Sequence, residues 1–383
     1  NMNVHSERSY QPGRVTRALI AGSSRCSSSP SIMPTGGQVK RRRTTIEDVA
    51  STAGVSRQTV SRVLNDMDLV AEKTRTRVLA AIEELNYRPD ASARRLASRR
   101  TYILGIVTAD LSDYTHARIL EGAEAEARER GYLIFASGAE LGRSGEPLRS
   151  PLLSQHQAEG LLIIYHGSHD DSYSIFEDIP DDLPVVTIGY APQRRNLVTV
   201  GITNQQAARQ ATEHLLGLGH CRIAHLTGPP EMYESEERRQ GYEEALREAG
   251  ISPDGTLVAA GDWSSASGYR ATLQLLDHGR SFTALFVQND RMAMGALQAL
   301  RERRLRVPED VAVVGFDDIP SAPYFAPPLT TIHHPLYRVG RTGARVLIDL
   351  INDKSASSKH TRLETKLVIR RSCGALGAGA ATD

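Results

Sequence analysis

Three polar side chains that can read nucleic-acid bases, Arg57, Gln58 and Arg62, lie within six residues of one another. They belong to the stretch DVASTAGVSRQTVSRVLND, residues 48–66. An arginine can donate two hydrogen bonds to guanine O6 and N7, and a glutamine can pair with adenine N6 and N7. The cluster therefore offers recognition of base-pair edges. A solvated helix face with generic charge is the alternative.

The apolar residues around this cluster predict three short helices. Thr45 and Asp48 favour a capped first helix, which we expect to end at Gly54. In the second helix, apolar positions recur at i, i+3 and i+4 from Val60, so the polar cluster faces away from the buried side. A third helix is predicted over 72–85. Two helices joined by a glycine-containing turn form a helix-turn-helix, whose second helix fits the DNA major groove.

The charge distribution supports a module that sits on a polyanion. The 383 residues carry a net charge of +1, and a chain of this length predicts two or three domains. Residues 40–100 hold 14 Lys and Arg against 8 Asp and Glu, whereas residues 101–383 hold 28 against 36. One end is basic and the bulk is acidic, as expected for a nucleic-acid-binding module attached to a larger domain that does not bind nucleic acid.

Composition excludes several other classes of protein. Residues 1–43 are rich in Ser, Gly, Pro and Arg, so we expect disorder there, with Met33 as a possible start. No apolar run reaches the roughly 20 residues of a membrane helix, and we expect a cytoplasmic protein with no membrane partner. Cys26, Cys221 and Cys373 are far apart, so we expect neither disulfides nor a metal site, and no cofactor.

Beyond Thr101, short apolar runs alternate with helical segments. Runs such as YILGIV, EGLLII, ALFVQND and VAVVGFDD are typical of parallel strands buried on both faces. The pattern predicts an α/β fold with two doubly wound parallel sheets. Ligands of such folds bind beyond the carboxyl ends of the strands, so the segments TAD, TGPP, QND and GFDD are the candidate binding positions.

Several long motifs resemble the LacI/GalR family of transcriptional repressors. TTIEDVASTAGVSRQTVSRVLND and ELNYRPDASARRLA resemble its DNA-binding headpiece and hinge. LLGLGHCRIAHLTGP, NDRMAMGALQAL, VPEDVAVVGFDDIP and PPLTTIHHP extend the similarity to about residues 44–371. The resemblance implies a homodimer on pseudo-palindromic operator DNA, with a periplasmic-binding-protein-like domain that senses a small molecule.

The resemblance assigns DNA contacts by position. Arg57 and Gln58 match the family's variable base-reading pair, and Arg62 matches a further base contact. Positions that match phosphate contacts, which give register and no sequence information, are Ser56, Thr59, Ser61, Asn65 and Thr74.

The same resemblance implies a hinge helix that enters the minor groove. Leu96 matches the residue that wedges into a central base step, with Ala93 nearby. The segment is too short to be a stable helix by itself in water, so we expect it to fold only when two copies meet on DNA. The alternative for Leu96 is packing against the larger domain.

An effector site is implied by residues that match the family's ligand positions. Trp263 is placed to stack on a pyranose-like face, although a lone tryptophan is equally a core residue. Arg238 matches a ligand-holding arginine, with Arg239 as a less favoured candidate, and Asn289 and Asp317 follow strand ends. One aromatic surface with an amide, a carboxylate and a guanidinium is typical of a sugar site. For Asp290 and Asp318 we favour structural roles.

The chain departs from the family pattern in three places. Thr115 and His116 stand where many members have two aromatic residues, and Thr203 and Asn204 stand where many have an aspartate. The first change disfavours a purine ligand, and both leave the specific sugar open. The tail SCGALGAGAATD lacks leucine heptads, so we expect no tetramerising bundle.

The resemblance also sets the expected boundaries. They are a disordered basic extension over 1–43, a helix-turn-helix domain over 44–89, a hinge helix over 90–100, an effector-binding and dimerisation domain over 101–371 and a tail over 372–383. Within the large domain we expect an N-subdomain over 101–220 and 333–352 and a C-subdomain over 221–332 and 353–371.

The function that we expect is a DNA-binding repressor of carbohydrate-utilisation genes, and two rival functions share some of its features. A solute-binding protein shares the large domain but has no use for residues 44–98 and requires an export signal. An enzyme would need a nucleophile with a base; the paired acids of GFDD and the adjacent His333 and His334 do not form a catalytic motif. We therefore expect a regulator and no enzyme.

Overall fold

The computed structural model describes most of the chain, which divides into two compact units, Asn1–Pro89 and Asp90–Asp383. We refer to them as the amino-terminal unit and the body. The described residues are 44–64, 70–87, 100–108, 110–138, 158–165, 179–189, 197–279, 281–352 and 360–375. The expected extension over 1–43 and all but the last residue of the expected hinge over 90–100 lie outside them.

The amino-terminal unit contains the three helices that the sequence predicts. They are α1 (Ile46–Ala53), α2 (Arg57–Leu64) and α3 (Glu72–Glu84). Their buried side chains form one small core in which valines and alanines from all three helices meet: Val49, Ala50, Ala53, Val60, Val63, Val78 and Ala81. The sequence prediction differs from the structure only at the end of α3, which stops one residue before Leu85.

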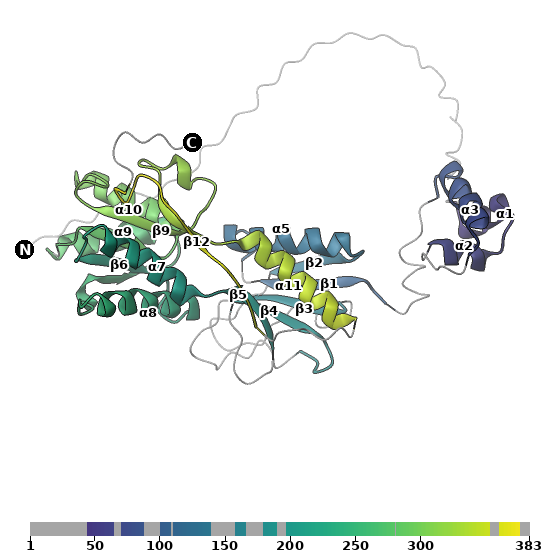
Figure 1. The fold of residues 1–383 in the computed structure, drawn as a ribbon, viewed down its shortest axis with the longest axis horizontal. Helices are drawn as coiled ribbons and strands as arrows, with labels where there is room; N and C mark the ends of the chain where they lie inside the picture. Colours follow the sequence, from purple (N-terminus) through teal and green to yellow (C-terminus); the bar gives the residue numbers. More distant parts are fainter. Residues whose placement is uncertain are drawn as a thin grey trace, which may run out of the picture. The chain divides into compact units, whose positions relative to one another are not determined.

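The body is built on two six-stranded sheets, each covered by helices (Figure 1). The first sheet has the order β11-β5-β4-β3-β1-β2. Its strands are β1 (Ile103–Thr108), β2 (Leu133–Gly138), β3 (Gly160–Tyr165), β4 (Val185–Gly189), β5 (Val198–Ile202) and β11 (His360–Leu363). All its pairings are parallel, and the apolar runs YILGIV and EGLLII make up most of its buried central strands β1 and β3.

The second sheet repeats this architecture in the order β12-β10-β9-β8-β6-β7. Its strands are β6 (Ile223–Thr227), β7 (Val258–Ala260), β8 (Ala284–Val287), β9 (Ala312–Asp317), β10 (Thr330–His333) and β12 (Lys366–Val368). Only the β10–β12 pairing is antiparallel. The predicted fold, with two doubly wound sheets, is therefore confirmed.

Helices cover the sheets in pairs. Helices α5 (Tyr114–Glu129) and α11 (Leu336–Ile351) pack together on one face of the first sheet. On the second sheet, α7 (Asn204–Gly217) and α8 (Tyr233–Glu248) cover one face, and α9 (Ser265–Asp277) and α10 (Asp290–Glu302) cover the other. Among the residues that the structure describes, two short 3-10 turns, η1 (Gly255–Leu257) and η2 (Ala322–Tyr324), complete the elements. In the part of the chain that the structure describes, no helix is both long and apolar enough to span a membrane.

Two expected subdomain boundaries are wrong. We placed residues up to 220 with the first sheet, but α7 packs on the second sheet and joins its core. We placed 353–371 with the second sheet, but β11 is an edge strand of the first. The reason is that the chain crosses between the sheets directly after β5, near Thr203, and crosses again between β11 and β12.

Both ends of the body are anchored by polar side chains. Arg100, expected in the hinge, donates to Glu159 over 2.7 Å and to the Asn352 side chain over 2.9 Å. Ser372, expected in the tail, is fully buried and donates to the Val313 carbonyl over 2.6 Å while accepting from the Thr330 backbone N–H over 2.8 Å. These residues belong to the folded body.

The contact between α5 and α11 depends on glycines. A β-carbon at Gly340 would lie 1.9 Å from the Ile119 carbonyl oxygen, and one at Gly122 would lie 2.0 Å from the Tyr337 carbonyl oxygen. Only glycine lets the two backbones approach this closely.

Gly340→Ala should therefore destabilise the body by about 1 to 3 kcal/mol, because the added methyl group forces the two helices apart. Thermal or urea unfolding measures the change. Gly217→Ala is the matched control: Gly217 is also helical, a β-carbon there meets no atom within 4 Å, and we expect no loss of stability. Equal stability of the two variants would contradict the close-packing argument.

Candidate DNA-reading and effector sites

The turn between α1 and α2 is fixed by contacts on both sides. The Thr45 hydroxyl accepts from the Asp48 backbone N–H over 3.4 Å in a capping box, and Gly54 ends α1 at φ 61°. Arg77 of α3 donates to the Gly54 carbonyl over 3.1 Å. A left-handed φ favours glycine, so the start and end signals predicted from the sequence are confirmed.

Helix α2 presents the predicted base-reading side chains to solvent. Arg57, Gln58 and Arg62 are exposed, whereas the apolar side of the helix joins the core of the amino-terminal unit. The Arg57 guanidinium pairs with Glu47 of α1, with Nη1 and Oε1 2.9 Å apart. All three side chains are accessible from solvent, and Arg57 carries a carboxylate neighbour, Glu47, that the sequence reasoning did not consider.

The predicted phosphate contacts lie beside this face. The Ser56 hydroxyl accepts from the Thr59 backbone N–H over 3.1 Å and lies 2.9 Å from the Thr59 hydroxyl, so Ser56 caps α2. Ser61 is half-buried in α2, and Thr74 is half-buried in the first turn of α3. Three further predicted DNA contacts, Asn65, Ala93 and Leu96, lie outside the described residues.

In the body, Arg238 of α8 is the centre of the effector candidates. It is 6% exposed, and its guanidinium donates to Asn204 Oδ1 over 2.9 Å and to the Gln288 carbonyl over 2.6 Å. It also lies over the rings of Phe316 and Trp263, 3.8 and 5.6 Å from their centroids. Burial lowers the pKa of Arg238, while the charge of nearby carboxylates raises it. Its neighbour Arg239 is exposed and pairs along the helix, so Arg238 is the better candidate.

Trp263 lies against this arginine in a strained backbone conformation. Its φ is 69°, a region that side chains other than glycine rarely adopt. The indole N–H lies 3.1 Å from the Met232 sulfur, and a β-carbon at Gly228 would lie 2.1 Å from the indole. The side chain is half-buried and packs against the edge of the core between the second sheet and α9 and α10. A partly exposed indole that is fixed by these contacts suits a stacking surface for a ligand.

The three acidic residues Asp290, Asp317 and Asp318 have different roles. Asp317 and Asp318 both have positive φ, 109° and 58°. Asp317 is 7% exposed and its charge acts on Arg238, whereas Asp318 pairs with Arg370 at 2.7 Å. Asp290 accepts from the Thr331 hydroxyl and a backbone N–H, and burial raises its pKa. Asp290 and Asp318 are structural, which leaves Asp317 as the candidate for the effector.

Three other predicted effector residues already have partners. Asn289 caps α10, accepting from the Met292 backbone N–H over 2.8 Å, and donates to the Trp263 carbonyl over 3.0 Å. His116 is buried, and its Nδ1 lies 2.9 Å from the Thr108 hydroxyl and 2.8 Å from the Asp110 carbonyl. The Thr115 hydroxyl donates to Asp113. Each therefore fixes a loop at a strand end, and an effector contact stays a prediction.

Sequence reasoning missed several residues of this site. Tyr114 lies one residue before the expected aromatic positions and packs against the cores of both halves of the body. Phe316 stacks under Arg238, Asn204 holds it, and the buried Glu234 adds to its electrostatic field. Tyr114 was detectable from its place after a strand, and Asn204 was noted only as a departure from the family's aspartate. The roles of Phe316 and Glu234 require knowledge of how α8 and β9 meet.

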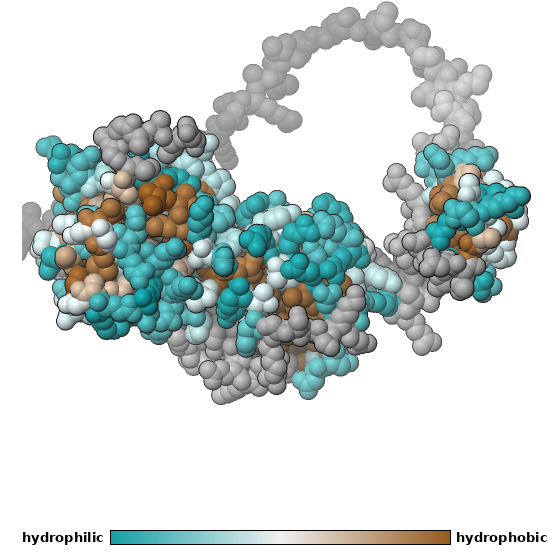
Figure 2. All heavy atoms as spheres, in the orientation of Figure 1, coloured by the Kyte–Doolittle hydropathy of each residue, from teal (hydrophilic) through white to brown (hydrophobic). Residues whose placement is uncertain are grey.

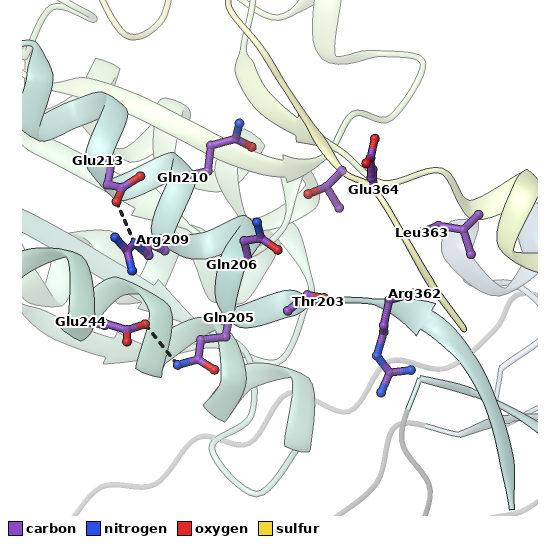
Figure 3. Close-up of a pocket in the computed structure, with 11 residues that line it drawn as sticks. Thr203, Gln205, Gln206, Arg209, Gln210, Glu213, Glu244, Arg362, Leu363 and Glu364 are labelled. Atoms are coloured by element: carbon purple, nitrogen blue, oxygen red, sulfur yellow. Dashed lines mark hydrogen bonds and ion pairs between the residues drawn. The ribbon is translucent and has the colours of Figure 1, made fainter. Parts of the chain in front are cut away.

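A cavity of about 850 Å³ lies elsewhere, between α7 and the segment 362–365 (Figure 3). Arg209 and Gln205 point along its wall and are paired with Glu213 and Glu244. Its lining contains none of the predicted effector residues. Polar side chains already paired with each other at an open surface are weak evidence for a ligand site, so we keep the cluster around Arg238 as the candidate.

Comparison with known proteins decides the family. The HTH-type transcriptional regulator CelR of Thermobifida fusca is 39% identical over 345 residues, which are 87% of this chain and 99% of CelR. The chain belongs to the lacI family of bacterial regulatory proteins. Family models match residues 45–90 of this regulator, described as bacterial regulatory proteins, lacI family, and residues 212–373, described as a periplasmic binding protein-like domain.

Solved structures agree with this assignment. A CelR–cellobiose complex has a TM-score of 0.65 at 36% identity, covering 86% of this regulator and all of that chain. The lac repressor dimer bound to operator and the anti-inducer ONPF has a TM-score of 0.72 at 32% identity, covering 87% and 99%. This lacI-family member is therefore a DNA-binding transcriptional regulator, and the solute-binding alternative is wrong.

Proposed function

We propose that this regulator binds a pseudo-palindromic operator as a homodimer, represses genes for carbohydrate use, and changes its operator affinity when a sugar binds in the body. The proposal that a sugar binds in the body rests on the cluster of Arg238, Trp263 and Asp317. These residues supply a buried guanidinium, an indole face and a carboxylate near strand ends. Such a set orients ring hydroxyls and stacks on a pyranose face. The regulator acts by binding and not by catalysis.

Base readout is assigned to α2. Arg57, Gln58 and Arg62 are exposed on the side opposite the core and project from one short helix. We assign phosphate contacts to Ser56, Thr59 and Ser61, which lie in or next to α2, and to Thr74 in the first turn of α3. The basic charge of residues 40–100 draws the unit to DNA whatever the sequence.

Cellobiose is the first sugar to test, because it is the ligand in the CelR complex described above. A bound sugar would contact α5 from the first sheet and Arg238 from the second, since Tyr114 packs against both cores. Holding the two halves in one arrangement changes the separation of the two hinges of a dimer, and such coupling is typically about 1 to 3 kcal/mol. A repressor controlled in this way fits a cytoplasmic location.

Homodimerisation is assigned to apolar side chains left exposed on the body. Helices α9 and α10 frame a cavity of about 440 Å³ lined by Tyr269, Met294 and Phe325, on a side of the body where brown, apolar residues gather (Figure 2). The edge strand β2 exposes Leu133 and Phe135. A monomer seldom leaves an apolar edge strand uncovered, so a second copy is the proposed cover for both surfaces.

Arg57→Ala should lower discrimination at one base pair of the operator by about 1 to 3 kcal/mol, because a bidentate base contact is lost. Titration of operator variants at fixed salt measures the loss. Ser61→Ala, at a predicted phosphate contact, should weaken binding to all variants alike. An Arg57→Ala effect that is uniform across sequences would make Arg57 a phosphate contact.

Trp263→Ala should abolish stabilisation by cellobiose without unfolding the body, because the stacking face is lost and the side chain is only partly buried, at the edge of the core. Wild-type protein with cellobiose at 100 times its Kd should gain about 2.7 kcal/mol in a thermal-shift measurement. A large fall in the melting temperature of ligand-free Trp263→Ala would show that Trp263 is a structural residue. A panel of saccharides that leaves the wild-type melting temperature unchanged would refute a sugar effector.

Met294→Asp should shift the protein from dimer to monomer in sedimentation velocity, because a charge replaces an exposed apolar side chain in the proposed interface. Met294→Leu is the matched control, since it keeps an apolar side chain of similar volume at the same position. A Met294→Asp protein that stays dimeric at the wild-type concentration would contradict the assignment of α9 and α10.

A further inference from the structure

A histidine is fully buried in β6, away from every predicted contact. His225 has 0% exposure, and its ring is stacked between Tyr242 and Phe286 with centroids 4.5 and 4.8 Å away. Burial lowers its pKa to about 3, so the ring is neutral at physiological pH. Nδ1 lies 3.2 Å from the Phe286 carbonyl oxygen and must carry the proton. Nε2 is therefore an acceptor.

The side chain of Gln288 completes this arrangement. Its Nε2 donates to His225 Nε2 and to the Ser235 carbonyl, each over 2.9 Å. Its Oε1 accepts from the Gly228 backbone N–H over 2.9 Å. Both amide hydrogens are used and the side chain has 0% exposure, so Gln288 cannot touch an effector. The neutral histidine fixes which end of the amide faces which partner.

These bonds join the three segments that support the effector candidates. Gly228 follows β6 and lies against the Trp263 indole, so closely that any β-carbon would overlap it. Ser235 is in the first turn of α8, one turn before Arg238. The backbone carbonyl of Gln288, which follows β8, accepts from the Arg238 guanidinium over 2.6 Å. The indole and the guanidinium are thus both positioned from one buried amide.

We propose that His225 and Gln288 are positioning residues of the effector site, which set the spacing between the Trp263 indole and the Arg238 guanidinium and so determine which ring fits against them. The inference rests on the proposed function for the identity of the ligand class, a sugar ring. The positioning itself is a property of the protein without ligand. Without the hydrogen bond from the Gly228 N–H to Gln288, the Gly228 segment would be free to move away from Trp263 and more of the indole would be exposed to solvent.

Trp263 reports on this arrangement directly, because it is the only tryptophan of the chain. We expect His225→Leu, in the full-length protein without ligand, to raise the iodide-quenching constant of Trp263 fluorescence at least twofold. Leucine fills much of the ring volume but offers no acceptor to Gln288. Gln288→Met removes the amide at similar length and tests the same point where His225→Leu does not fold, as judged by gel filtration and circular dichroism.

The double variant His225→Leu/Gln288→Leu removes every bond of this arrangement. It relieves the unpaired amide donor of the single variant, but it leaves the Gly228 N–H and the Ser235 carbonyl without the amide, so the melting temperature should fall below that of His225→Leu. The quenching constant should be raised at least as far as in His225→Leu. A wild-type quenching constant in the folded double variant would overturn the proposal and leave only a structural pair.

Ser372→Ala is the matched control. Ser372 is equally buried and makes two hydrogen bonds in the same sheet, to the backbone of Val313 and Thr330. It should lower the melting temperature and leave the quenching constant unchanged. An unchanged constant in folded His225→Leu and Gln288→Met would refute the proposal.

Binding of cellobiose gives the second readout. With wild-type binding established by calorimetry, His225→Leu should raise the Kd at least tenfold, and a Kd within twofold of wild type would count against a positioning role. If wild-type protein binds no saccharide but the quenching constants change as stated, the sugar assignment fails and the positioning role stands.

Discussion

The buried guanidinium of Arg238 is the constraint on which the second sheet and its helices depend. Each segment around it supplies a polar or aromatic group that compensates for the loss of water. Isolated burial of a charge costs several kcal/mol, so a guanidinium at 6% exposure must be compensated. Asn204 supplies an amide oxygen, Gln288 supplies a backbone carbonyl, and Phe316 supplies an aromatic face 3.8 Å away. These groups come from α7, the end of β8 and β9. The charge therefore holds together elements that are distant in sequence.

The two halves of the body meet through both apolar and charged contacts. Tyr114 begins α5 on the first sheet and packs against the cores of both sheets. Ile202 of β5 lies in the core of the second sheet, and Leu363 of β11 packs against both cores. Asp113, which caps α5, pairs with Arg291 of α10 at 3.0 Å. A partly exposed ion pair contributes little to stability, so the apolar contacts are the ones that a change of arrangement between the halves would have to alter.

The sequence was most informative where local rules act. Capping at Thr45 and the left-handed Gly54 were predictable because a cap depends on a few neighbouring residues. The strands were predictable because burial on both faces leaves an uninterrupted apolar run. The subdomain boundary near Thr203 was not, because α7 has an amphipathic pattern that fits either sheet. The support of Trp263 by Gly228, and of both by Gln288, also depends on contacts between strands far apart in sequence.

The ion pair between Arg57 and Glu47 bears on the proposed base readout. Both side chains are largely exposed, so their pairing at 2.9 Å is screened by salt and contributes at most about 1 kcal/mol. If Arg57 is the base contact that we propose, DNA displaces Glu47 from its guanidinium at little cost. The Glu47 carboxylate would repel nearby phosphates, so it favours an Arg57 that reaches a guanine edge over one that binds the DNA backbone.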